Sequence, residues 1–220
     1  MKNFLVLLAF SLLSLSVASA STLPCTISTG GDSPVTSGTV IMCGGLTFDN
    51  FQVLHPTGGA AGTVDILSAG LDAAGEIDLT FNPNLGPSQD EQLLFAVWGG
   101  ITQIDMSVAG NLASITERAC ANPIATTGDF EGLCTNAAGT AVAAPLAQIS
   151  VDSNESAVSG TFTGTSPVYI FKDIQAGDPN GQLTEFTQTF QPSVPEPVST
   201  VLLGSGLLAL GLLRRKSRKS

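Results

Sequence analysis

Few side chains of this chain could carry out catalysis. His55 is its single histidine, so a Ser-His-Asp or Cys-His arrangement would have to use it. It stands before Pro56 in a turn-like stretch without a nucleophile motif, and we expect a surface loop residue. Paired carboxylates of the glycosidase kind are available, but the sequence does not show which of them converge. A non-enzymatic protein is therefore predicted, with a secreted carboxylate-dependent hydrolase as an alternative.

Calcium binding is a second chemistry that the acidic residues allow. Hard cations take several oxygen ligands, which turns rich in Asp and Asn supply. Neither of two candidate groups matches the D-x-[DN]-x-[DN]-G loop, and a solvated acidic surface is the alternative, so no metal ligand or other cofactor is assigned. The groups are Asp173, Asp178, Asn180 and Glu185 in one expected hairpin, and Asp72, Glu76 and Asp78 in another.

Basic residues are scarce away from the ends of the chain. Arg118 and Lys172 are the only two between residues 21 and 191, against seventeen acidic residues. Proteins neutralise phosphate with Lys and Arg, so nucleic-acid binding is excluded. A lone lysine in a strand-rich protein can form an isopeptide crosslink with an asparagine beside a carboxylate. The alternative for Lys172 is an ion pair with Asp173 or another acid.

The elements that position these residues are expected to be short strands. Residues 76–81 and 101–108 alternate polar and apolar side chains with the period of two of a half-buried strand. Regularly spaced strands separated by turns predict an all-β fold over residues 21–191, an antiparallel β-sandwich or jelly roll. The longest loop is expected at 82–92 and a hairpin turn at 178–181. Further strands are expected at 39–42, 51–54, 63–67, 148–152, 161–163, 168–171 and 183–190.

The N-terminus has the pattern of a secretory signal peptide. Lys2 precedes an apolar run over residues 4–17, and the small residues Ala18 and Ala20 form a cleavage site. We expect the translocon to export the chain and signal peptidase to remove residues 1–20, so that Ser21 begins the mature protein. A permanent anchor is the less favoured alternative, because the apolar run is short for a membrane span.

The C-terminal residues 192–220 form a second segment with an order of its own. Pro195, Glu196 and Pro197 precede an apolar run over 198–213, which predicts a single transmembrane helix. Under the positive-inside rule, the basic cluster that follows stays cytoplasmic and the body lies outside. This cluster begins with Arg214, Arg215 and Lys216.

These three parts, in this order, resemble the PEP-CTERM sorting signal of exported proteins in exopolysaccharide-producing Gram-negative bacteria. The resemblance covers about the last 27 residues. It implies that exosortase, a polytopic cysteine protease, recognises Pro195, Glu196 and Pro197 and cleaves near them. Residues 45–51, 171–174 and 186–190 resemble strands of one β-rich group of these proteins. The resemblance implies an inner-membrane intermediate and then a cell-surface or matrix location.

Four cysteines lie in the body, Cys25, Cys43, Cys120 and Cys134. An even number in an exported chain favours disulfides, and no close C-x-x-C pair indicates a metal site. Of the three connectivities, Cys25–Cys43 and Cys120–Cys134 are preferred because each closes a local loop.

Together the sequence predicts a non-enzymatic surface or matrix protein associated with exopolysaccharide or biofilm, or alternatively a glycan- or calcium-binding surface module.

Overall fold

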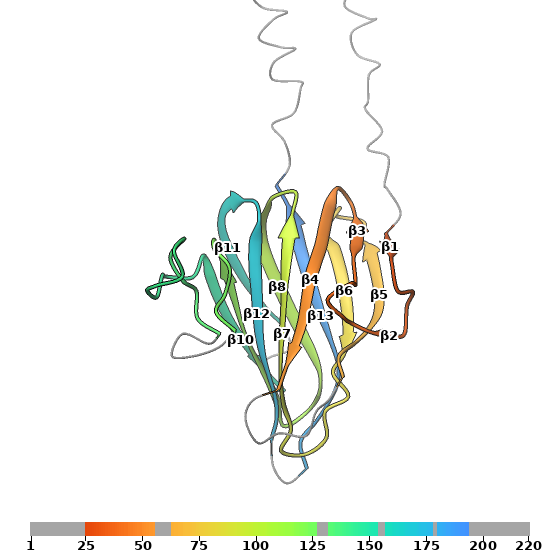
Figure 1. Ribbon diagram of the computed structural model, residues 1–220. Coiled ribbons are helices and arrows are strands. Elements are labelled where there is room, and N and C mark those ends of the chain that lie inside the picture. The colour runs from red at the N-terminus through yellow and green to blue at the C-terminus, as the bar shows by residue number, and fades with distance from the viewer. Residues whose placement is uncertain (1–24, 56–62, 127–131, 154–156, 178–179, 194–220) are drawn as a thin grey trace, which may run out of the picture.

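Two antiparallel β-sheets face each other in this protein (Figure 1). The structure is a computed structural model that describes residues 25–55, 63–126, 132–153, 157–177 and 180–193. The predicted signal peptide, its cleavage site, and the sorting motif with its apolar run and basic cluster lie outside these ranges. No helix long and apolar enough to cross a membrane occurs within the described ranges.

The larger sheet has seven strands, and the smaller sheet has six. In spatial order the larger sheet contains β1 (Thr26–Ile27), β3 (Ile41–Cys43), β4 (Leu46–Leu54), β7 (Asp90–Trp98), β12 (Val168–Ala176), β9 (Ala113–Cys120) and β10 (Ala147–Asp152). The smaller sheet contains β11 (Val158–Thr165), β8 (Ile101–Asn111), β13 (Gln182–Pro192), β6 (Ile77–Asn82), β5 (Asp65–Leu71) and β2 (Ser33–Pro34). The predicted antiparallel sandwich is confirmed, and from β6 onward the chain passes repeatedly between the sheets.

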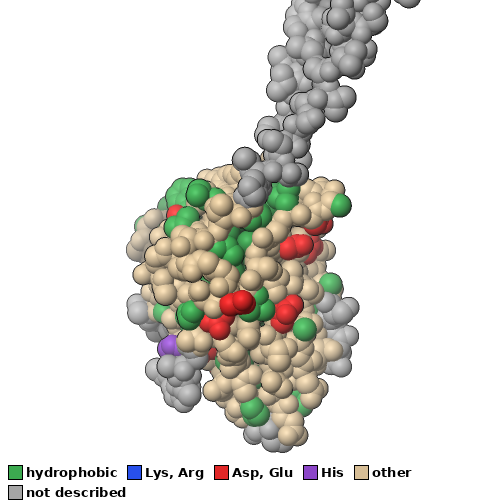
Figure 2. Space-filling view, turned by 90° about the vertical axis from the view of Figure 1, so that its right-hand side faces the viewer, with side chains coloured by type: hydrophobic (Ala, Val, Ile, Leu, Met, Phe, Trp, Pro, Cys, Tyr) green, Lys and Arg blue, Asp and Glu red, His purple; other side chains and the backbone are tan. Residues whose placement is uncertain are grey.

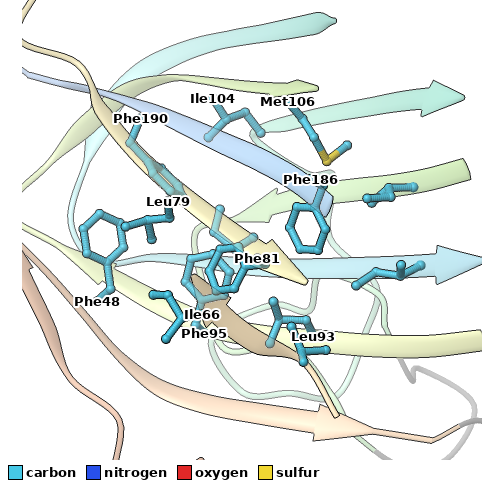
Figure 3. Close-up of a cluster of buried hydrophobic side chains, with 14 of the residues drawn as sticks. Phe48, Ile66, Leu79, Phe81, Leu93, Phe95, Ile104, Met106, Phe186 and Phe190 are labelled. Carbon is cyan, nitrogen blue, oxygen red and sulfur yellow. The ribbon is translucent and has the colours of Figure 1, made fainter. Parts of the chain in front are cut away.

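Phenylalanine rings fill the centre of the sandwich (Figure 3). Phe81 and Phe186 of the smaller sheet stack with their ring centroids 5.1 Å apart, and Phe51 and Phe95 of the larger sheet do the same at 5.1 Å. Offset ring pairs of this kind add to the stabilisation that burial of their large apolar area provides. Phe48 of the larger sheet and Phe190 of the smaller sheet lie with their ring centroids 5.0 Å apart, so the buried aromatic layer also joins the two sheets.

Two central strands of the larger sheet were missing from the sequence prediction. The expected loop at 82–92 extends too far, because β7 already begins at Asp90. Strand β7 is buried on both faces, so its side chains form a continuous apolar run instead of alternating. In β9 the alternation is broken because the buried position between Ile115 and Ala119 is occupied by Glu117.

The hairpin expected at 178–181 is also wrong. Strand β12 pairs with β7 and β9 in the larger sheet, whereas β13 pairs with β6 and β8 in the smaller one. The connection therefore crosses between sheets, which a sequence-local turn signal cannot distinguish from a hairpin. Asp173 and Glu185, proposed as neighbours in one calcium site, lie on strands of opposite sheets.

Candidate functional site

A groove of about 320 Å³ lies on the outer face of the larger sheet. Its floor is formed where three neighbouring strands place outward-facing residues side by side: Asp49 of β4 pairs with Ala96 of β7, which pairs with Tyr169 of β12. The groove is of the size that small ligands occupy. It is lined by Asn50, Gln52, Leu94, Phe95, Ala96, Pro123, Ile124, Thr126, Tyr169 and Ile170.

A β-bulge in β4 sets the polar edge of the groove. The pairing of β4 with β7 shifts between Asp49 and Gln52, and Asn50 within the bulge has a left-handed backbone with a φ of 57°. Asparagine adopts this conformation more readily than most residues, and bulges commonly redirect side chains at functional sites. Both Asn50 and Gln52 are exposed, so their carboxamide groups are available to a ligand.

Trp98 is anchored beside this bulge. Its indole Nε1 donates a hydrogen bond to Asp49 Oδ1 at 2.8 Å, and the Asn50 side-chain amide donates to the same oxygen at 2.9 Å. Trp98 is 40% exposed, an unusual state for so large an apolar ring. Together with the half-buried Tyr169, it gives this end of the sheet two accessible aromatic side chains.

The opposite wall of the groove belongs to the segment that follows β9. The disulfide Cys120–Cys134 ties this segment to the sheet, and Ile124 forms a β-bridge with Cys134. Arg118 reaches over the ring of Phe171, 5.8 Å from its centroid, and donates from Nη1 to the Gly132 carbonyl oxygen at 2.9 Å. Gly132 of this segment lies against the ring of Phe171, and the groove lies where Pro123, Ile124 and Thr126 meet the sheet.

Both predicted disulfides are present. Cys25–Cys43 joins β3 to the residue before β1, at the far edge of the larger sheet, while Cys120–Cys134 supports the groove wall. The cysteines could be recognised from the sequence, but the groove residues could not. Tyr169 is the only tyrosine of the chain and Trp98 the only tryptophan, a rarity that was the one available signal.

A second hollow of about 370 Å³ lies at the other end of the larger sheet. It is bordered by the ends of β9, β10 and β12, and its lining contains no aromatic ring. Its residues are Leu112, Ala113, Ser114, Asp152, Ser153, Gln175, Ala176 and Gly177. Without a ring on which a ligand could stack, it is a weaker candidate than the groove.

The carboxylates do not form the sites that the acidic sequence suggested. Within the described ranges, no group of three or more His, Cys, Asp and Glu residues could hold a metal ion. Asp72 accepts hydrogen bonds from the backbone amides of Ala74 and Glu76, which closes the turn between β5 and β6, and Asp78 accepts one from Thr189. Desolvation, and then the neighbouring carboxylates of Asp72, Asp105 and Asp78, raise the pKa of Glu76. Asp178 lies outside the described residues.

One carboxylate pair lies on the outer face of the larger sheet. Burial, and then the charge of Asp173 and a hydrogen bond with it, raise the pKa of Asp90 to about 6. A glycosidase separates its two carboxyl groups by roughly 5 Å or more to admit the sugar. The carboxyl groups of Asp90 and Asp173 are instead close enough to share a hydrogen bond. Neither residue lines the groove. The pair is therefore a structural feature of the sheet surface.

His55 is the exposed loop residue that the sequence predicted, directly after β4, and it has a buried partner. Its Nδ1 lies 2.5 Å from Oε2 of Glu91, a carboxylate with no exposed surface, while the imidazole itself is 34% exposed. Glu91 occupies an inward position on β7, which has no signature in the sequence.

On one side of the protein, carboxylates are scattered over the surface and no Lys or Arg side chain is seen (Figure 2).

Lys172 forms an ion pair with a carboxylate, which was one of the two alternatives predicted from the sequence. It points between the sheets and forms an ion pair with Glu117, its direct cross-strand neighbour, at 2.7 Å. The sequence predicted an ion pair with Asp173 or another acid, and the partner is Glu117 rather than Asp173 because adjacent strand residues point to opposite faces. A glutamine of the other sheet, Gln188, also contacts the amine.

No family model matches the chain, and no curated protein matches it. Among solved structures it is similar to a family 11 carbohydrate-binding module from Clostridium thermocellum in complex with a β-1,3-1,4-mixed-linked tetrasaccharide. The identity is 10% over 67% of this chain and 91% of that chain, with a TM-score of 0.30. It is also similar to the family 11 module of the cellulosomal cellulase Lic26A-Cel5E of that organism. There the identity is 9% over 67% and 90% of the chains, with a TM-score of 0.28. Similarity of this degree assigns no residue and no ligand, so the groove is interpreted from its own geometry.

Proposed function

We propose that this protein is a non-enzymatic surface module that binds a neutral glycan in the groove on the larger sheet. The observation that carries the proposal is the combination of Tyr169 with the exposed carboxamides of Asn50 and Gln52 around one hollow. Aromatic rings contact the apolar faces of sugar rings, and carboxamides both donate to and accept from hydroxyl groups. This is the set of contacts that a neutral sugar chain requires.

The charge of the protein narrows the class of glycan. With Arg118 over Phe171 and Lys172 fully buried, neither cationic side chain of the body lines the groove. A polyanionic polysaccharide would be repelled by the surrounding carboxylates, and more strongly at low salt. A neutral polysaccharide does not experience this repulsion.

Export and sorting complete the proposal. The signal-peptide pattern and the PEP-CTERM resemblance of residues 192–220 support export, recognition by exosortase, and a final location at the cell surface or in the matrix. A glycan-binding module delivered there meets the exopolysaccharide of its own cell. The sorting step is tested separately, by the mass of the mature C-terminus with and without exosortase.

Affinity electrophoresis in gels that contain a soluble neutral β-glucan, or alginate as a polyanion, tests the binding directly. We expect retardation by the neutral polymer and none by alginate. Gln52→Ala should weaken the retardation about 5- to 10-fold, since an unreplaced hydrogen bond is worth roughly 1–1.5 kcal/mol. Tyr169→Ala should abolish it.

Gln191→Ala is the matched control, because Gln191 is an exposed strand glutamine of the other sheet. It should bind like the unaltered protein. Equal losses from Gln52→Ala and Gln191→Ala would argue against the groove. Retardation of a folded protein by no neutral polymer, in a panel that includes β-glucans, α-glucans and galactans, would overturn the proposed ligand class.

A further inference from the structure

Three polar side chains meet in the middle of the apolar core, where each has no exposed surface: Glu117 of β9, Lys172 of β12 and Gln188 of β13. Glu117 and Lys172 belong to the larger sheet, and Gln188 belongs to the smaller sheet. The cluster therefore bridges the two layers of the sandwich. Polar side chains are rarely placed so deep unless each of them is paired.

The amine of Lys172 lies between the other two groups. Its Nζ is 2.7 Å from Glu117 Oε2 and is in direct contact with Gln188 Oε1. Because Oε1 is bonded to Cδ, the amine lies at most one C=O bond length, roughly 1.2 Å, further from the carboxamide carbon Cδ than from Oε1. Met106 Sδ lies 3.5 Å from Nζ and the Phe186 ring centroid lies 5.4 Å away, so the remaining surroundings are apolar.

One polar atom of this cluster has no assigned role. Among the described residues, Glu117 Oε1 is buried without any hydrogen-bond partner, although an unpaired buried carboxylate oxygen is costly. Burial raises the pKa of Glu117 and lowers the pKa of Lys172, each against the opposing effect of its partner. Both shifts favour a neutral amine, which is nucleophilic, next to a carboxylic acid, which can donate a proton.

We propose that Lys172 and Gln188 join in an intramolecular isopeptide bond, with Glu117 as the group that relays the proton. The lone pair of Nζ attacks Cδ, the Nζ–Cδ bond forms, and the Cδ–Nε2 bond breaks. One proton passes from Nζ through the Glu117 carboxyl group to Nε2, which leaves as ammonia. Glu117 ends in its initial state, and no oxidant, reductant or further reactant is consumed.

The bond would connect the two sheets covalently through the core. It closes a loop between strands β12 and β13, whose residues 172 and 188 are separated by 16 positions. Neither disulfide links the sheets in this way, because one joins residues at the edge of the larger sheet and the other holds the segment after β9. The inference rests on the core cluster and is independent of the glycan proposal.

Peptide mapping of the purified full chain, denatured and reduced, provides the test. A protease that cleaves after glutamate places Lys172 in the peptide 156–185 and Gln188 in the peptide 186–196. We expect one branched species with the summed mass of both peptides less one ammonia, about 17 Da. Trypsin should cleave after Arg118 and fail to cleave after Lys172.

Two variants assign the roles. Glu117→Gln should leave the two peptides separate, whereas Asp173→Asn, an outward-facing neighbour of Lys172 on the same strand, should leave them joined. Separate peptides of encoded mass from the unaltered protein, with tryptic cleavage after Lys172, would overturn the proposal whether or not any variant folds. A joined species in Glu117→Gln would overturn the role of Glu117.

Discussion

Strand β12 serves two regions of opposite character. Facing inward, Lys172 lies among buried partners that belong to both sheets. Facing outward, Tyr169 lies in a groove whose polar side chains are exposed. The two residues are three positions apart, and the alternation of side chains along a strand is enough to separate them.

The difference shows what each region can be used for. In the core, where water is absent, a polar atom without a partner in the protein is costly, and within the described part of the chain Glu117 Oε1 is such an atom. At the outer face, water satisfies Asn50 and Gln52 until a ligand replaces it. The core cluster is thus suited to holding the sheets together, and the groove is suited to exchange with solvent and ligand.

The largest expected effect lies in the core. Glu117→Leu leaves the Lys172 amine uncrosslinked and without its carboxylate partner, and should lower the free energy of unfolding by about 3–5 kcal/mol. The double variant Glu117→Leu/Lys172→Met also lacks the crosslink but removes both buried polar groups, so it should be much less destabilised than the single variant. Urea unfolding followed by tryptophan fluorescence measures both.

If Glu117 and Lys172 stabilise the core together, substitutions at the two positions must be energetically coupled. Residues in direct contact give non-additive changes in stability, whereas independent residues add. A double variant that loses the sum of the two single losses would show that the buried pair is not energetically coupled. The same variants should keep the groove, so residual folded protein should still bind a neutral glucan.

The disulfides sharpen the contrast between the two regions. Replacing both members of either pair by alanine should cost about 2–4 kcal/mol, since the two pairs span similar separations of 18 and 14 residues. Only Cys120→Ala/Cys134→Ala should also weaken glycan binding, because the groove wall follows Cys120. Cys25→Ala/Cys43→Ala is the control for stability, and equal binding by both double variants would contradict the role of the wall.

The variant Gly132→Ala tests how closely the segment that follows β9 packs against Phe171. A Cβ at this position would lie 2.6 Å from Cζ of Phe171, and the residue has a φ of +69°. Gly139 has the same φ of +69° with nothing within 4 Å of an added Cβ, so Gly139→Ala isolates the backbone strain, about 1–2 kcal/mol. Gly132→Ala should cost about 1–3 kcal/mol more than this control. Equal melting temperatures would place Phe171 away from the segment.

Much of the fold was predictable from the sequence because most strands bury one face only. The alternation over 76–81 and 101–108 corresponds to β6 and to most of β8. The prediction failed at β7 and β9 for two physical reasons: β7 is covered on both faces, and β9 carries Glu117 inward to meet a lysine 55 positions away. Long-range pairing of this kind leaves no local pattern.

The groove was less predictable than the sheets. It depends on cross-strand registers that bring Asp49, Ala96 and Tyr169 into one row, and on a bulge that redirects Asn50. Neither register nor bulge position is determined by residues close together in sequence. The cysteine pairing, in contrast, was accessible because each disulfide closes a local loop.

The smallest expected effect concerns the carboxylate pair on the outer face. The pKa of Asp90 is raised from 3.8 to about 6 in the folded protein, so the folded state holds this proton more tightly than the unfolded state. Stability should therefore fall as the pH rises from about 4 to 6, where the unfolded chain has already lost the proton. The half-buried carboxylate is screened by solvent, which limits the change to about 1 kcal/mol or less.

Asp90→Asn should flatten this part of the pH profile in urea unfolding and raise stability slightly at pH 7, whereas Asp32→Asn, at an exposed turn, should leave the slope in place. A slope that persists in Asp90→Asn would assign it to another group and would leave the outer face without a titrating carboxylate pair.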